Sequence, residues 1–342
     1  MSSQPSFEQI IADIPDIGMD KHREALINNA TQNKSLIKNT IRNIPIPEGK
    51  KSDSVIVINA GPSVRRQKTA NKIAEHSYSG TVVACDGAYV TCLRAGLIPD
   101  YVLSLDPHPK RIVRWYGDPN LEENMKNDDY FERQDLDISF RDSSMKANEE
   151  VIELVNTHAH KTKSILCTSV SKSLTDRIQD AGFDIYWWNP LIDNPNNEDS
   201  LTRKLYDITK APAMNTGGNV GTASWVFAAS KLNIGNIAVT GMDLGYYADL
   251  PYEKSQVYYE LANHIGGTEG IEKYFKHFTF PLTGEKYYTD PCYYWYRNNF
   301  LDLLKIMPGK TVNCTGGGVL YSDNLECLHL DDFIAQQEKE NG

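Results

Sequence analysis

Five short turns carry the residue types that could bind a ligand. They are rich in Gly, Asn, Asp and Ser, each follows a predicted strand or begins a predicted helix, and they span 59–63, 86–89, 106–109, 215–219 and 241–246. Glycine lets the backbone approach a ligand closely, and the free amides at the start of a helix attract an anion. Turns of this kind suit a phosphate-bearing ligand, although any one of them alone could be a simple strand-to-helix connection.

Short β-branched runs alternate with helical stretches and must position these turns. Strands are predicted at 55–58, 81–85, 101–105, 136–140, 164–167, 184–187 and 237–240, and helices at 64–76 and 88–95. Continuous apolar strands separated by helices predict an α/β fold, a Rossmann-like mostly parallel sheet with helices on both faces. Because ligands bind at the carboxyl ends of parallel strands, we expect all five turns to converge on one edge.

Three consecutive segments differ in composition. Residues 1–50 are polar and helix-favouring, and the stretch 44–52 that closes them contains two prolines and a glycine. Residues 51–250 carry the alternating strands and helices, which predicts a Rossmann-like nucleotide-binding core. Residues 251–342 are richer in aromatic side chains and less regular, which predicts a C-terminal lid or acceptor subdomain packed on the core.

The composition is that of a globular protein and argues against several functions. The formal net charge is −10, so duplex nucleic acid is not an expected partner. No apolar run approaches the roughly 18 residues that a membrane span needs. The first residues lack the basic flank and apolar run of a signal peptide, and the six cysteines contain no C-x-x-C pair. These features predict a cytoplasmic protein with reduced thiols.

Several motifs of other enzymes are absent. Gly61 is not followed by the glycines of G-x-G-x-x-G, which argues against a dinucleotide dehydrogenase. The tripeptide 309–311 ends like a P-loop but lacks the first glycine and a preceding strand, so we predict a surface turn there. The chain has neither H-E-x-x-H nor G-x-S-x-G, which argues against zinc and serine hydrolases.

The ordered set of motifs resembles the Maf (motility-associated factor) glycosyltransferase domain, which is shared with MptE-like 6-hydroxymethylpterin diphosphokinases. The resemblance extends from about residue 21 to residue 330, and the stretches that carry it are 57–63, 84–89, 96–107, 217–223 and 239–246. Two more stretches, 284–291 and 313–320, are similar to the C-terminal part of the Maf domain. Asp106-Pro107 also stands where the diphosphokinases have an acidic Asp-x-Asp-Gly. These features favour the glycosyltransferase branch.

The Maf domain in turn is similar to bacterial sialyltransferases that use a CMP-activated nonulosonic sugar. This resemblance implies an inverting glycosyltransferase with a nucleotide-sugar donor, a hydroxyl acceptor on a protein, glycan or lipid, and no required cofactor. The positions expected to bind the nucleotide are Asn59, Gly61, Pro62, Ser63, Asp86, Gly87, Asp106, Thr216, Gly217, Gly218, Asn219, Gly241 and Asp243.

The same resemblance implies that tyrosine hydroxyls face the leaving phosphate, and the matching positions are Tyr246 and Tyr247. A phenol can donate a hydrogen bond to that phosphate without a metal ion.

A general base remains to be found. In the sialyltransferases a histidine shortly before a Thr-Asp pair is the base, but no histidine stands just before Thr289-Asp290 in this sequence. The candidates are Glu285 and His277, each able to accept a proton from an acceptor hydroxyl, and His108 is a comparable one.

Two alternatives stay open. A pyrophosphokinase would use ATP and Mg²⁺ to diphosphorylate a pterin alcohol, with Asp86, Asp106 or Asp243 on the metal ion. A nucleotide-sugar-binding module that has lost its base would bind the donor without turning it over.

Overall fold

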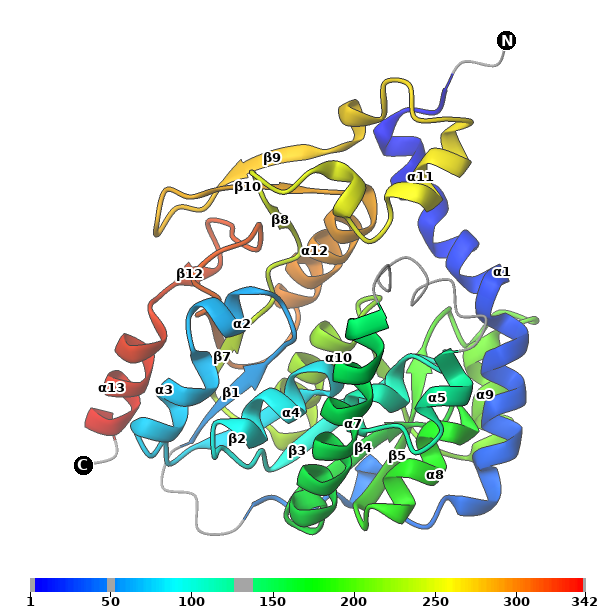
Figure 1. Cartoon of the computed structure of the whole chain (residues 1–342), viewed down its shortest axis with the longest axis vertical. Coiled ribbons are helices and arrows are strands. Elements are labelled where there is room, and N and C mark those ends of the chain that lie inside the picture. Colours follow the sequence, from blue (N-terminus) through cyan, green and yellow to red (C-terminus); the bar gives the residue numbers. More distant parts are fainter. Residues whose placement is uncertain (1–3, 48–52, 126–137, 341–342) are drawn as a thin grey trace. The chain divides into compact units, whose positions relative to one another are not determined.

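The computed structural model describes residues 4–47, 53–125 and 138–340, and it divides the chain into two compact units. The first unit comprises 1–23, 50–80 and 216–342, and the second comprises 24–49 and 81–215 (Figure 1). Each unit is therefore assembled from segments that are distant in sequence. The division into consecutive segments 1–50, 51–250 and 251–342 stays a prediction.

The main sheet of the first unit consists of parallel strands. Their order is β12-β11-β7-β1, and their bounds are β1 (Ser54–Ile58), β7 (Asn236–Thr240), β11 (Lys310–Asn313) and β12 (Glu326–Cys327). Every residue of β1 is buried, as expected for a Val- and Ile-rich strand covered on both faces. The helices of this unit are the start of α1 (Phe7–Asn33), α2 (Ser63–Arg66), α3 (Thr69–Glu75), α10 (Val220–Phe227), α11 (Tyr258–Ile265), α12 (Pro291–Leu304) and α13 (Leu330–Glu340).

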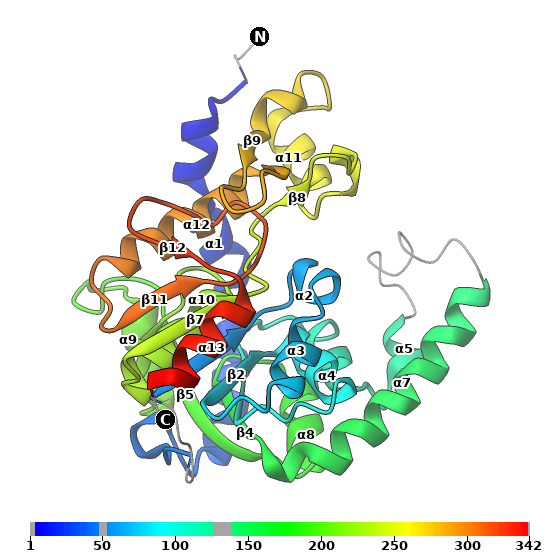
Figure 2. The same cartoon turned by 90° about the vertical axis from the view of Figure 1, so that its left-hand side faces the viewer.

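A small antiparallel sheet in the first unit contains much of the aromatic segment. Strand β10 (Lys286–Thr289) is its middle strand, between β8 (Tyr246–Tyr247) and β9 (Lys276–Thr279). Helix α13 packs beside α3 and β7 of the main sheet (Figure 2).

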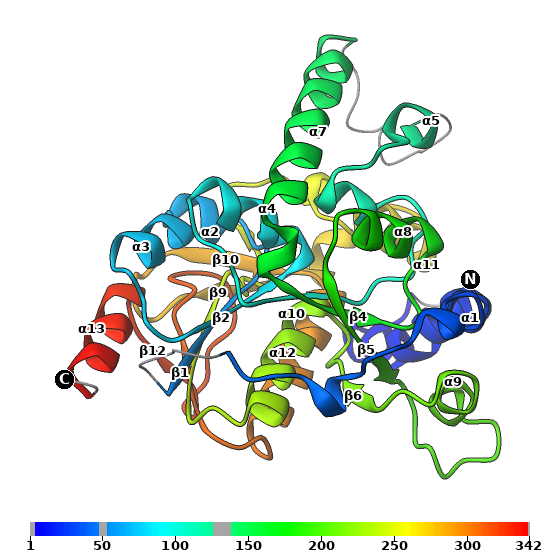
Figure 3. The ribbon, with the colours of Figure 1, turned by 90° about the horizontal axis from the view of Figure 1, so that it is seen from below.

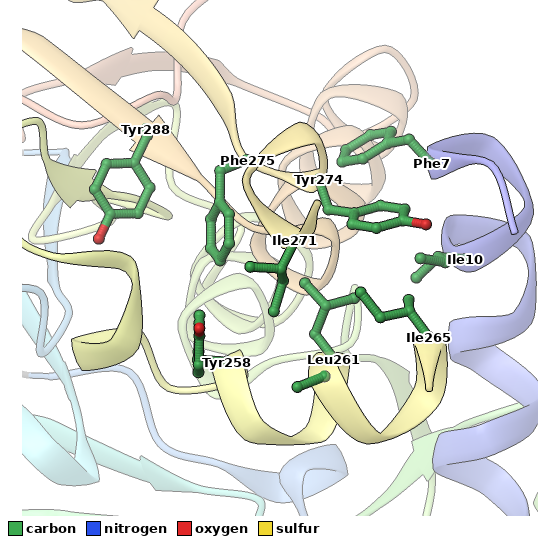
Figure 4. Packing of buried hydrophobic residues seen from close by; sticks show 10 residues of the cluster. Phe7, Ile10, Tyr258, Leu261, Ile265, Ile271, Tyr274, Phe275 and Tyr288 are labelled. Atoms are coloured by element: carbon green, nitrogen blue, oxygen red, sulfur yellow. The ribbon is translucent and has the colours of Figure 1, made fainter. Parts of the chain in front are cut away.

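The start of α1 is held in the first unit by a hydrophobic cluster (Figure 4). Phe7 and Ile10 of α1 pack with Leu261 and Ile265 of α11 and with the buried Tyr274. Phe7 also makes an edge contact with a ring of α12, at a centroid distance of 5.4 Å. Phe7 and Ile10 are thus part of the hydrophobic core that the aromatic segment forms.

The second unit is a parallel sheet with helices on both faces. Its strand order is β2-β3-β4-β5-β6, and the bounds are β2 (Thr81–Cys85), β3 (Tyr101–Ser104), β4 (Lys163–Cys167), β5 (Asp184–Leu191) and β6 (Ala213–Asn215). The helices are the end of α1, α4 (Asp86–Arg94), α5 (Leu121–Met125), α7 (Ile138–His158), α8 (Lys172–Asp180) and α9 (Leu201–Thr209). Figure 3 shows α8 and α9 on opposite sides of β5. The predicted α/β fold class is confirmed.

Three local predictions differ from the structure. The strand expected at 136–140 is wrong for 138–140, because these residues begin the 21-residue helix α7, and 136–137 lie outside the described residues. The helix expected at 64–76 is two helices, since Lys68 adopts a positive φ of 52° between them. The P-loop-like tripeptide is not a simple surface turn, because Lys310 and Thr311 begin β11.

The helices and the cysteines relate to the predicted cytoplasmic location. Among the helices of the described ranges, none has both the length and the apolarity of a membrane span. All six cysteines are free thiols, four of them buried. The cytoplasmic location stays a prediction.

Candidate functional site

Polar side chains meet where β1 and β7 of the first unit end. Asn59 follows β1 directly, and Asp243 comes three residues after β7. Ser63 donates a hydrogen bond from Oγ to Oδ2 of Asp243 at 2.7 Å, and the amide of Gly61 donates to the carbonyl of Gly241 at 2.9 Å. We call these five residues the Asp243 cluster. They show that two predicted turns, 59–63 and 241–246, form one local structure.

Close packing explains the glycines of this cluster. A Cβ on Gly61 would lie 1.9 Å from Oδ2 of Asp243 and 2.4 Å from the carbonyl oxygen of Gly241. Gly318 has a φ of +82°, and a Cβ there would lie 2.2 Å from the backbone oxygen of Asp243. The backbone therefore encloses Asp243 from two sides, and any larger residue would force it apart.

Burial determines the electrostatics of the cluster. It raises the pKa of Asp243 to about 6, while the hydrogen bond from Ser63 and the charge of Arg66 act in the opposite direction. Oδ1 of Asp243 and Oδ1 of Asn59 are both buried and accept no hydrogen bond from any described residue. Buried acceptors without a donor are costly, so both oxygens are suited to hydroxyl or amino donors of a ligand.

A pH series should reveal the buried carboxyl. Because its pKa is higher in the folded chain than the ordinary 3.8, Asp243 contributes stability that is present below about pH 4 and lost as the pH rises through about 6. Without ligand, the unfolding free energy of Asp243→Asn should therefore rise relative to the wild type between pH 4 and 7, by up to about 3 kcal/mol.

Denaturant unfolding at several pH values measures this difference. Asp249→Asn, the same substitution at an exposed position of the following segment, is the matched control. Parallel curves for Asp243→Asn and the wild type would contradict the assignment.

The turn 216–219 is also part of this site. Asn219 caps α10, and its Oδ1 accepts a hydrogen bond from the amide of Thr222 at 2.9 Å. A Cβ on Gly221, in the first turn of that helix, would lie 2.5 Å from Oδ1 of Asn59. The start of α10 therefore adjoins the Asp243 cluster, with helix amides beside the unpartnered amide oxygen.

The two candidate tyrosines point in opposite directions. Tyr246 pairs with Tyr288 and Tyr247 pairs with Tyr287 across the small sheet. Successive side chains of a strand lie on opposite faces, so each tyrosine shares a face with its own partner. His277 pairs with Tyr288 and therefore lies on the face of Tyr246.

Tyr247 interacts with Arg66 and with the charge of Asp243. The guanidinium of Arg66 lies 3.3 Å from the centroid of the Tyr247 ring. Burial raises the pKa of Tyr247, and the charge of Asp243 adds to this rise. Tyr287 lies 5.0 Å from Tyr247 by ring centroids and donates from its hydroxyl to Oε2 of Glu285 at 2.6 Å. Tyr247 and Glu285 are thus linked through one tyrosine.

The face of Tyr246 is occupied by structural contacts. Its hydroxyl donates to Oδ2 of Asp290 at 2.9 Å and accepts from the backbone amide of Gln256 at 3.0 Å. Its ring stacks between Tyr288 and Tyr293, at 5.2 and 5.3 Å. The single hydroxyl proton of Tyr246 is therefore used within the protein, at the capped start of α12.

His277 is exposed and lies on the face of the small sheet opposite to Tyr247. Its Nε2 lies 2.9 Å from the hydroxyl of Tyr252. No contact with Glu285 or Tyr247 joins it to the other face of the small sheet within the described residues. The two candidate bases therefore lie in different surroundings.

The remaining candidates belong to the second unit. Asp86 begins α4, accepts a hydrogen bond from the amide of Gly87 at 2.7 Å, and has its other oxygen buried without a partner among the described residues. Burial raises its pKa to about 7, and the charge of Asp106 contributes. The exposed Asp106 accepts from the amide of His108 at 2.7 Å. That these residues share one site with the Asp243 cluster stays a prediction.

Metal ligands are sparse in both units. Within the described ranges, no three His, Cys, Asp or Glu side chains gather to hold a metal ion. The two carboxylates of Asp86 and Asp106 could assist only an ion that is also held by ligand phosphates, which is how proteins commonly bind Mg²⁺.

Sequence reasoning missed two residues of the first unit. Arg66 ends the short helix α2, which begins after Pro62, and Tyr287 joins Tyr247 to Glu285. The spacing of Ser63 and Arg66 was a usable signal, because residues three apart on a helix share a face. No signal along the chain indicates Tyr287, since its role depends on cross-strand pairing.

Comparison with known proteins agrees with the resemblance found in the sequence. Residues 24–116 match the family model described as 6-hydroxymethylpterin diphosphokinase MptE-like. An uncharacterized protein of Treponema pallidum (strain Nichols) is 30% identical over 111 residues, which cover 30% of this chain and 52% of that protein. The chain thus spans about half of that relative.

A solved structure with a similar fold is the Maf glycosyltransferase from Magnetospirillum magneticum AMB-1. The TM-score is 0.52 at 14% identity, and the match covers 94% of this chain and 41% of the other. At that identity the likeness concerns the fold. Together with the family match, it confirms the resemblance to the Maf and MptE-like proteins.

Proposed function

We propose that the protein is a glycosyltransferase of the Maf type, which transfers a CMP-activated nonulosonic, sialic-acid-like sugar to a hydroxyl acceptor with inversion. The observation that carries the proposal is a connected set of contacts and charge interactions in the first unit. It runs from Ser63 and Asp243 through Arg66 and Tyr247 to Tyr287, and from there to Glu285. It places a buried acceptor, a phenol and a surface carboxylate in one neighbourhood.

Each part of this set has a role in the proposed reaction. The glycine turns and the start of α10 hold the nucleotide, and the unpartnered oxygens of Asn59 and Asp243 accept hydrogen bonds from its hydroxyl or amino groups. The pKa of Tyr247 lies above the ordinary value of 10, so its hydroxyl is protonated at neutral pH and can donate to the leaving phosphate. Charge then develops on the phosphate next to a donor that is already in place.

Glu285 is the proposed general base. Its carboxylate accepts the proton of the acceptor hydroxyl while the acceptor oxygen bonds to the anomeric carbon. The bond from that carbon to the phosphate oxygen breaks, and CMP departs with the electron pair. Attack from the side opposite the leaving group inverts the anomeric centre. This reaction requires no metal ion.

Nucleotide binding gives the first test. CMP and CTP should raise the melting temperature more than UDP, ADP or ATP do, and without Mg²⁺. A ligand at about 100 times its Kd adds roughly 2.7 kcal/mol to the unfolding free energy, which a thermal-shift assay detects easily. Release of CMP from a CMP-linked nonulosonic sugar then measures turnover.

A diphosphokinase is the second candidate, and the family match favours it. The matched residues 24–116 include Asp86 and Asp106, whose carboxylates could hold Mg²⁺ on the phosphates of ATP. A Mg²⁺-dependent shift with ATP that exceeds the shift with CMP would replace the glycosyltransferase proposal by this one.

A further inference from the structure

Arg66 carries a positive charge that acts on the Asp243 cluster. The reaction steps proposed above give this charge no role. Arg66 stands three residues after Ser63 on α2, so the two side chains project from the same side of the helix. Its guanidinium lies over the ring of Tyr247, 3.3 Å from the centroid, and its charge acts on Asp243. Arg66 therefore contacts the proposed leaving-group donor and acts through its charge on the buried cluster.

Arg66 is an exposed residue, and its guanidinium stacks on this ring. It forms neither a hydrogen bond nor an ion pair with another described residue. An arginine that rests on an aromatic face keeps the N–H groups at its edge open, in a fork that matches a carboxylate or phosphate. Stacking also restrains the long side chain, so less freedom is lost when an anion binds.

The negative net charge of the chain means that an anionic ligand needs a nearby cation in order to bind. The chain has a net charge of −10, and a CMP-linked nonulosonic sugar is itself an anion. Long-range repulsion opposes its binding unless a local positive charge compensates. Arg66 is the cation that contacts Tyr247 in this part of the site.

We propose that Arg66 binds the carboxylate of the transferred sugar and thereby selects donors that carry this group. The inference rests on the proposed function. In a nonulosonic sugar the carboxylate is bonded to the anomeric carbon, which also bears the phosphate oxygen of CMP. Two neighbouring groups of the ligand thus correspond to two neighbouring groups of the protein, the Tyr247 hydroxyl for the phosphate and the Arg66 guanidinium for the carboxylate.

The test compares ligands that differ only at this group. The probes are CMP, CMP-N-acetylneuraminate and its C1 carboxamide, which has nearly the same shape but no negative charge on the sugar. The wild type should bind the carboxylate form about 10-fold or more tightly than the carboxamide, as expected for a charge-assisted pair. In Arg66→Gln this preference should fall to about two-fold or less, and the affinity for CMP should fall less than the affinity for CMP-N-acetylneuraminate.

Arg65 provides the matched control. It precedes Arg66 on the same helix, is also exposed, and contributes the same charge. Arg65→Gln should keep the wild-type preference, because only the long-range part of the attraction is lost. Arg66→Lys keeps the charge without the planar fork and should give an intermediate preference.

The outcomes separate this inference from the proposed function. Equal weakening of CMP and both sugar nucleotides in Arg66→Gln would assign the arginine to the phosphate and overturn the inference. So would an unchanged preference in Arg66→Gln, an equal loss in Arg65→Gln, or a wild type that binds CMP but does not distinguish carboxylate from carboxamide. A wild type that binds neither CMP nor CMP-N-acetylneuraminate would overturn the proposed function itself.

Discussion

Glu285→Gln is expected to lower the rate of sugar transfer by roughly 10²- to 10⁴-fold, the usual contribution of a general base. Glutamine can still accept the hydrogen bond from the Tyr287 hydroxyl, so the local structure should persist. It cannot take the acceptor proton. Steady-state CMP release with a saturating hydroxyl acceptor measures the loss.

Two controls isolate the role of the base. Hydrolysis of the donor without acceptor should suffer less than transfer does, because water is small and can release its proton to solvent. His277→Ala should keep transfer within a few-fold of the wild type, since His277 lies on the other face of the small sheet. A large loss in His277→Ala with normal transfer in Glu285→Gln would move the base to the histidine.

Tyr247→Phe should lower kcat by about 10²-fold and leave CMP affinity near the wild-type value. A donor that acts on developing charge contributes mainly in the transition state, so its loss affects turnover more than binding. The phenyl ring remains beneath Arg66, so the carboxylate preference should persist in this variant. Single-turnover rates and CMP titrations on the same protein measure both quantities.

Tyr246→Phe is the matched control, because it removes the same hydroxyl from the adjacent residue on the opposite face. The substitution removes the hydrogen bond that the Tyr246 hydroxyl donates to the buried carboxylate of Asp290. We therefore expect a loss of about 1–3 kcal/mol in unfolding free energy and little change in kcat. The reverse pattern, with Tyr246 needed for turnover and Tyr247 dispensable, would place the leaving group on the other face.

Local sequence determined the strand-and-turn order of both units. The runs 55–58, 81–85, 164–167 and 237–240 are strands in the structure, because short buried β-branched segments have few alternatives to a covered parallel strand. The short run at 136–140 did not determine a strand, since residues 138–140 continue into a long helix. Runs of two to four residues such as β8 and β12 were missed, because their pairing partners lie far away along the chain.

The meeting of the turns 59–63 and 241–246 could be predicted from the sequence, because their glycines mark sites where the backbone must pack closely. Gly61 is adjacent in space to Asp243, and the pair Ser63–Asp243 forms because both follow neighbouring parallel strands. The rule that parallel strands end at one edge was therefore sufficient to bring this part of the candidate site together.

The amino-acid sequence by itself determined the α/β class, and it supplied the prediction that the glycine turns bind a ligand and the list of tyrosine, glutamate and histidine candidates. Only the tertiary structure shows which of those candidates share a face of the small sheet. Strand register places Tyr247 with Tyr287 and Tyr246 with Tyr288, and a shift of one residue would exchange the two faces. That register depends on packing between β8 and β10, 40 residues apart, and on the cluster that covers one face of the small sheet. Such long-range contacts leave no periodic pattern along the chain, so the partners of Arg66, Tyr247 and Glu285 become visible only in the folded protein.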